Sequence, residues 1–123
     1  MINNTLSQCE YGLVVRPYVS STVAWTNNIV SGATGAFVNT GGWAVGTVDH
    51  NLYFGGGVGP DAHPTTLDPQ FVDAASGDFR LGAGSPAIDA GDPTTTTAEA
   101  GLLDLAGNPR IAGGRVDLGA LEY

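Results

Sequence analysis

Three similar four-residue phrases recur near the N-terminus at an almost constant spacing. They are Asn3-Asn4-Thr5-Leu6, Asn27-Asn28-Ile29-Val30 and His50-Asn51-Leu52-Tyr53, whose second residues lie 24 and then 23 positions apart. A repeat of this length, rich in Val, Thr and Asn and without helical spacing of its apolar residues, is typical of one turn of a β-solenoid. Successive turns would pair parallel strands about 4.8 Å apart.

The net charge of the chain argues against two classes of binding partner, nucleic acids and anionic membranes. The net charge is −8, lysine is absent, and the four cations are Arg16, Arg80, Arg110 and Arg115. Without a basic patch to neutralise phosphates, we expect no binding to nucleic acid or to an anionic membrane surface. The chain contains no stretch of about 18 apolar residues, so we expect no membrane-spanning helix, and no secretion signal is visible. Because Met1 opens almost directly onto a repeat, we expect the chain to begin inside a longer array.

The C-terminal half has a different, non-repetitive character built from five spaced motifs. These occupy 68–73, 77–81, 84–91, 104–110 and 116–123. Together they resemble the C-terminal end of bacterial right-handed parallel β-helix repeat proteins, in particular the choice-of-anchor Q type. The upstream region is similar, more loosely, to the last coils of a pectate-lyase-like β-helix. The resemblance implies a terminal module and an extracellular or cell-surface location.

The sequence repeat and the family resemblance together predict an all-β right-handed parallel β-helix of about two to three coils, followed by a non-repetitive C-terminal cap. We expect one domain over 1–123, with coils over 2–55, a Gly/Pro linker loop over 56–66 and the cap over 67–123. Within the cap, the pattern predicts a hairpin around 71–81, one helical turn at 85–91 and a final strand over 116–123.

The asparagines of the repeat predict a structural ladder. Asn4, Asn28 and Asn51 fall at the same position of successive coils. Stacked amides can hydrogen-bond to each other and to the backbone at a corner, which satisfies groups that would otherwise be buried unpaired.

The aspartates of the cap most simply serve turns and ion pairs. Most of them adjoin Gly, Pro or Asn, as residues of Asx-turns do. We expect Arg110 and Arg115 to pair with Asp104 or Asp117. No cofactor is expected, although the density of hard oxygen ligands leaves a structural calcium open.

The two histidines do not predict a metal site. His50 and His63 have no cysteine or second histidine at zinc spacing, and His50 stands where Asn3 and Asn27 stand in the other coils. His50 is therefore interpreted as a corner residue.

No catalytic set is visible in the repeats. The carboxylates of residues 1–66 are only Glu10, Asp49 and Asp61, which fall at different corners, and no lysine base exists. Carbohydrate contact is open for Trp43, the aromatic residue that best fits an exposed position, and for Tyr18 and Arg16, which could line one face with Glu10.

We therefore expect a non-enzymatic structural or adhesion-type end module of a bacterial surface or secreted protein. The alternative is the C-terminal piece of a carbohydrate-active enzyme, a lyase or glycosidase, whose catalytic coils lie upstream. Because the first coil would expose unpaired strand edges, we also expect a homodimer buried through Leu6, Leu13 and Val15.

Overall fold

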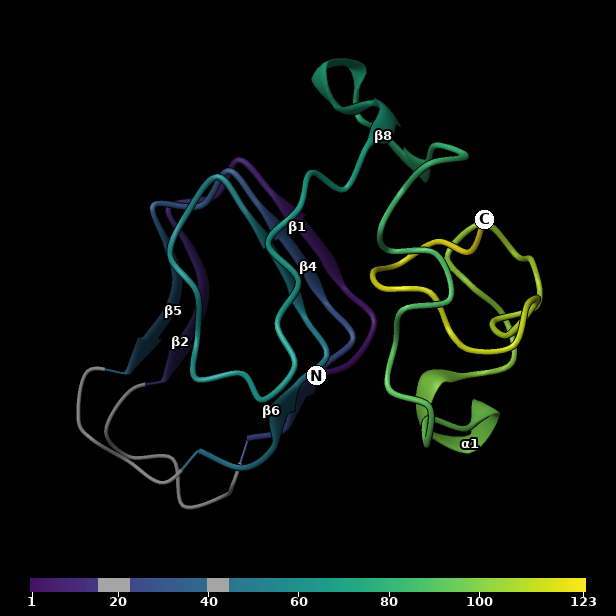
Figure 1. Cartoon of the computed structure of the whole chain (residues 1–123), viewed down its shortest axis with the longest axis horizontal. Coiled ribbons are helices and arrows are strands. Elements are labelled where there is room, and N and C mark those ends of the chain that lie inside the picture. Colours follow the sequence, from purple (N-terminus) through teal and green to yellow (C-terminus); the bar gives the residue numbers. More distant parts are fainter. Residues whose placement is uncertain (16–22, 40–44) are drawn as a thin grey trace.

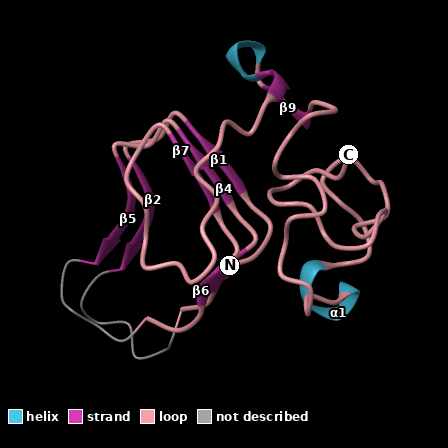
Figure 2. Ribbon diagram, viewed as in Figure 1, coloured by secondary structure: helices cyan, strands magenta, loops and turns pink. Residues whose placement is uncertain are grey.

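The chain forms many short strands and very little helix. A computed structural model describes residues 1–15, 23–39 and 45–123 (Figure 1). Its strands contain two to five residues each, and loops and turns make up most of the rest (Figure 2). In chain order the elements are β1 (Thr5–Ser7), β2 (Tyr11–Val15), β3 (Trp25–Thr26), β4 (Ile29–Ser31), β5 (Gly35–Asn39), β6 (Val48–Asp49), β7 (Leu52–Phe54), β8 (Phe71–Asp73), the 3-10 helix η1 (Ala74–Ser76), β9 (Asp78–Leu81) and α1 (Thr97–Ala100).

The sequence period sets the register of the strands. β1, β4 and β7 form a parallel sheet in which Thr5, Ile29 and Leu52 lie side by side. β2 pairs with β5 and β3 pairs with β6, again in parallel. We call the three stacked segments that begin at the phrases of the repeat layers one, two and three. Each layer thus places its strands beside those of the next.

The chain turns at the same two places in each layer. The first corner is left-handed at Asn3, Asn27 and His50, with φ of 54°, 57° and 50°. Asparagine and histidine tolerate this conformation better than most side chains. A second left-handed corner follows at Gln8, Gly32 and Gly55.

β4 and β7 of the three-stranded sheet are buried on both faces. Val30 and Tyr53 point into the interior of the stack, where they pack with Leu13, Trp25 and other apolar residues. Their neighbours Ile29 and Leu52 point to the opposite face, as alternation along a strand requires.

The C-terminal segment, residues 82–123 after β9, covers that outer face. Ala87 and Leu118 pack against Ile29 and Leu52, and all four are at most 1 % exposed. Gly119 donates its N–H to the Asn27 carbonyl at 2.8 Å. A Cβ at Gly119 would lie 2.6 Å from the Thr5 hydroxyl oxygen, so only glycine permits this approach. In Figure 1 the segment lies beside β1 and β4, along the flank of the stack.

The expected right-handed parallel β-helix with a C-terminal cap is wrong. The described strands fall into four small separate sheets, three parallel and one antiparallel, and none of these sheets is closed or continuous like that of a solenoid. Strands of two to five residues, interrupted by left-handed corners, do not merge into long sheets. Beyond residue 81 the described chain has one isolated bridge, Leu103 with Pro109, and the four-residue helix α1.

The segment expected to be a linker loop pairs with β6, at the end of layer two, and with β7 in layer three. The backbone N–H of Ala62 donates to the Val48 carbonyl at 3.2 Å, and the backbone N–H of Tyr53 donates to the Thr65 carbonyl at 2.8 Å. Residues 61–65 therefore form a short fourth layer that covers one end of the stack.

Within the C-terminal half only the hairpin has the expected secondary structure. β8 and β9 pair antiparallel around η1, with Phe71 opposite Leu81. Residues 85–91 form turns, stabilised by the Ser85 hydroxyl, which accepts the N–H of Ala87 at 3.1 Å. Residues 116–123 form no strand, because their N–H groups bond to separate side chains and carbonyls instead of to a neighbouring strand.

Replacing Leu118 by alanine should test how strongly the C-terminal segment is docked. The change leaves a cavity beside Ile29 and Leu52, so the free energy of unfolding should fall by about 2–4 kcal/mol in urea denaturation. Leu105→Ala is the matched control, because Leu105 lies in the same segment and is 79 % exposed. Equal stability of the two variants would show that the segment does not pack on the sheet.

Candidate functional site

The three repeat asparagines form a continuous chain of hydrogen bonds along the stack. The amide oxygen of Asn28 accepts both the backbone N–H and the Nδ2 group of Asn4, each at 2.9 Å. The amide oxygen of Asn51 accepts the same two groups of Asn28, again at 2.9 Å. Each Nδ2 group also donates to the carbonyl two residues earlier, as from Asn28 to Thr26 at 2.8 Å. Asn28 and Asn51 are fully buried, so these bonds satisfy groups that water cannot reach.

This ladder has a direction, and it ends on a carboxylate. Asp61 Oδ2 accepts the N–H of Asn51 at 3.0 Å and its Nδ2 group at 2.6 Å. The hydroxyl of Tyr53 donates to the same oxygen at 3.1 Å. Burial and the Asp61 charge raise the pKa of Tyr53 above its ordinary value. Asp61 thus takes the place of a fourth asparagine, which sequence reasoning missed because the spacing shortens to 10 residues.

The expected ion pairs of the cap do not form. Arg110 instead contacts Glu122 at 3.4 Å and donates to the carbonyls of Gly119 and Ala120 at 3.3 and 3.2 Å. Arg115 donates through Nε to the Gly91 carbonyl at 3.0 Å. Both arginines therefore hold backbone in place.

Asp104 closes the turn that its sequence context indicates. Its two oxygens accept the N–H groups of Ala106 at 2.9 Å, Asn108 at 2.7 Å and Glu122 at 3.0 Å. Burial raises the pKa of Asp104, but these hydrogen bonds outweigh it and hold the pKa below its ordinary value.

Asp117 and Glu122 form a buried acidic pair beside Arg110. Both carboxylates bond to backbone, and the Glu122 side chain is 3 % exposed. Burial, followed by the charge of Asp117, raises the pKa of Glu122 to about 7. Burial also raises the pKa of Asp117. Glu122 therefore exchanges its proton near neutral pH.

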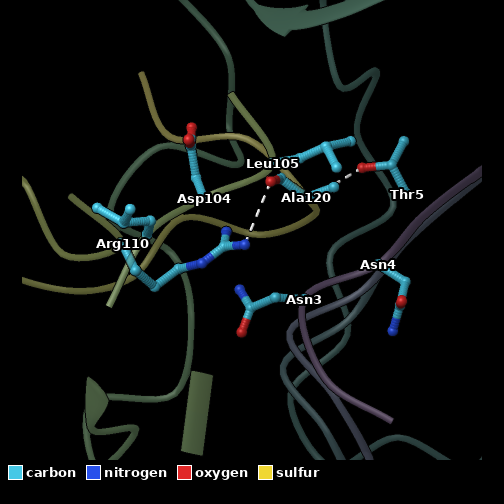
Figure 3. Close-up of a pocket in the computed structure, with 8 residues that line it drawn as sticks. Asn3, Asn4, Thr5, Asp104, Leu105, Arg110 and Ala120 are labelled. Carbon is cyan, nitrogen blue, oxygen red and sulfur yellow. Dashed lines mark hydrogen bonds between the residues drawn. The ribbon is translucent and has the colours of Figure 1, made fainter. Parts of the chain in front are cut away.

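A pocket of about 420 Å³ opens between layer one and the C-terminal segment (Figure 3). Figure 3 shows the Arg110 guanidinium reaching toward Asn3. Neither the buried Nε of Arg110 nor the buried amide oxygen of Asn3 has a hydrogen-bond partner among the described residues. The only carboxylate that lines the pocket is Asp104, whose oxygens already accept backbone N–H groups. The lining is Asn3, Asn4, Thr5, Leu103, Asp104, Leu105, Arg110 and Ala120.

The fourth layer brings together a group that sequence reasoning did not anticipate. Asp49 Oδ1 lies 2.8 Å from Nδ1 of His63 and 3.0 Å from Nδ1 of His50. The two imidazole rings lie 4.8 Å apart, tilted by 35°. His50 occupies the left-handed corner expected for it, but the returning segment places His63 beside it. The signal available in the sequence was weak, because it required pairing residues 61–65 with layer three.

The residues considered for carbohydrate contact, Trp43, Tyr18 and Arg16, lie outside the described residues. The chain matches no protein-family model, no curated protein and no solved structure. The family resemblance noted from the sequence therefore stays a prediction. Among the described residues, no helix is long and apolar enough to cross a bilayer.

Asn28→Ala should destabilise the protein more than Asn4→Ala. Replacing Asn28 leaves the N–H of Asn4 without a partner and removes one of the two donors to the Thr26 carbonyl, which should cost about 1–3 kcal/mol in urea unfolding. Asn4→Ala is the matched control, because no described group donates to the Asn4 amide oxygen. If both variants lost the same stability, the ladder would not be directional in its energetics.

The stability of the protein should fall as pH rises from about 5 to 7.5. Between its ordinary pKa of 4.5 and its folded value of about 7, Glu122 keeps its proton when folded and loses it when unfolded. The unfolded state then binds fewer protons, so a rising pH favours unfolding, by about 1–3 kcal/mol over this window. Urea titrations at several pH values would measure this slope.

Glu122→Gln should flatten the slope, since the amide carries no titrating proton. Glu99→Gln, which alters an exposed glutamate in α1, should leave the slope unchanged. A wild-type stability that rises with pH across this window would contradict the assignment.

Proposed function

We propose that the chain is a non-catalytic structural module that closes one end of a stack of parallel strand layers and joins a second copy through the other end. The observation that carries the proposal is the directional ladder. The ladder ends at the Asp61 carboxylate. At its other end, no described residue donates a hydrogen bond to the amide oxygen of Asn4.

The closed end accepts no further layer of the same kind. Asp61 Oδ2 already accepts three hydrogen bonds, and Oδ1 accepts the N–H of His63 at 2.9 Å. A carboxylate carries no N–H, so it cannot donate to an amide oxygen in a following layer as asparagine does. Asp61 thus stops the ladder.

The open end is a strand edge. β1 pairs with β4 on one side, through bonds such as Ile29 N–H to the Asn4 carbonyl and Gln8 N–H to the Ser31 carbonyl. By alternation, the backbone groups of Thr5 and Ser7 face the other side, where no described strand pairs with them. An exposed edge of this kind recruits another strand.

The charge distribution allows a second copy to approach at this edge. Among the described residues, Asp104 is the only carboxylate that lines the pocket beside β1, and its oxygens already accept backbone N–H groups. β1 itself carries no charged side chain, so two copies can meet there without placing carboxylates face to face. A two-fold axis at the edge would pair β1 with its own copy, antiparallel.

The residues first expected in the interface would contribute little to it. Leu13 and Val15 are 8 % and 4 % exposed within one chain, and Leu6 packs on the same core. We therefore propose an interface of backbone hydrogen bonds at β1, flanked by the exposed Tyr11 and Met1.

The carboxylates of the described residues support a non-catalytic role. Asp61, Asp104 and Asp117 each accept several hydrogen bonds that hold the fold. An acid and base for glycosidic cleavage must instead converge on an accessible substrate. This favours the structural module over the carbohydrate-active alternative.

Sedimentation equilibrium at tens of micromolar should report a mass twice the 12.5 kDa of one chain. Ser7→Pro removes an N–H from the open edge and should yield monomers, because proline cannot donate there. Ser7→Ala is the matched control and should remain dimeric. Circular dichroism would verify that both variants fold.

A wild-type protein that sediments as a monomer would overturn the assembly. Cleavage of pectate, alginate or xylan by the purified protein would overturn the non-catalytic role and favour the enzyme alternative.

A further inference from the structure

We propose that Asp49, His50 and His63 bind one zinc ion at the junction of layers two and three, where the fourth layer covers them. One carboxylate oxygen of Asp49 and one nitrogen of each imidazole lie within 4.8 Å of one another. Asp49 Oδ1 lies between the two rings, 3.0 Å from His50 Nδ1 and 2.8 Å from His63 Nδ1. This inference does not depend on the dimer.

The inner two ligands are held in place by the fold. The side chains of Asp49 and His50 are 19 % and 16 % exposed. The backbone N–H of His50 donates to Asp49 Oδ1 at 2.9 Å, which fixes the carboxylate beside the corner. Nδ1 of His50 is buried and makes no hydrogen bond, although it lies 3.0 Å from that oxygen. A metal ligand is thus placed without a competing partner.

The outer ligand is free to adjust. The His63 side chain is 67 % exposed, whereas its backbone is anchored by the hydrogen bond from its N–H to Asp61 Oδ1 at 2.9 Å. Zinc bonds of about 2.0–2.1 Å in a tetrahedron separate neighbouring ligand atoms by about 3.3 Å. The two separations from Asp49 Oδ1, 2.8 and 3.0 Å, need to widen by only a few tenths of an ångström, and all three ligand atoms already lie within 4.8 Å of one another. Rotation of the exposed His63 ring can supply that movement.

The donor types select zinc over calcium or magnesium. Imidazole nitrogen suits zinc and its neighbours in the transition series, whereas calcium and magnesium take oxygen ligands. The charge of the surroundings favours any divalent cation: Asp61 anchors His63, and Asp92 lies close enough to interact electrostatically with His50. Three protein ligands leave a fourth position for water or for a donor group from another molecule.

Isothermal titration of the full chain with zinc chloride, in a buffer that does not chelate zinc, should reveal one site per chain. His63→Gln should weaken binding by at least about 10-fold, because it removes one ligand. Its exposed side chain makes no contact with the two cores, so the variant should fold. Asp68→Asn, which alters an exposed aspartate outside the cluster, is the control and should bind as the wild type does.

A second variant tests the inner ligand without straining the backbone. Asn3 and Asn27 hold the left-handed corner at the equivalent positions, so His50→Asn preserves that conformation. It should weaken zinc binding to a similar degree, and a calcium excess should not displace zinc from the wild type. In NMR spectra, zinc should shift the ring signals of both histidines. Zinc binding of equal strength in wild type and His63→Gln, or no binding at all, would overturn the site.

Discussion

Layers one and two each depend on a side-chain amide of the next layer, whose oxygen accepts the backbone N–H that follows their corner. The left-handed corner at residue 27 interrupts regular pairing, and the N–H that follows it, on Asn28, would be buried without a partner. The amide oxygen of Asn51 accepts it. An unsatisfied buried donor costs about 1–3 kcal/mol, so the corner is tolerable only where the next layer supplies this oxygen. The left-handed corner of a layer and the stacking of the next layer on it therefore depend on each other.

The end of the ladder also explains the site next to it. Asp61 must lie above Asn51 to accept its N–H and Nδ2 groups, and this positions the segment that follows. Two residues later, His63 is anchored to the same carboxylate and reaches Asp49. The Asp49 and histidine cluster is thus a geometric consequence of how the ladder is terminated.

The sequence predicted local repetition better than it predicted the global fold. The period placed Asn4, Asn28 and Asn51 in register, because a constant offset between parallel strands leaves one choice of pairing. It did not reveal that the sheets stay small and separate, because strand length depends on corners such as Gln8 that have no distinctive motif. The partners of Arg110 and Arg115 were missed because both arginines bond to carbonyl groups, which every residue carries. The fourth layer was missed because residues 56–60 read as a flexible loop.

Because the ladder repeats the same donors and acceptors at each step, the layers are interchangeable units. The 23 residues from Asn28 to His50 begin at one ladder position and stop just before the next. A tandem duplication of this unit would insert a layer whose asparagine accepts from the layer before it and donates to the layer after it. An insertion of one or two residues would instead have to be absorbed by a loop, or it would displace every later asparagine from its partner. Changes in length are therefore tolerated most easily in whole layers, so a gene encoding this arrangement can lengthen in steps without new contacts having to evolve.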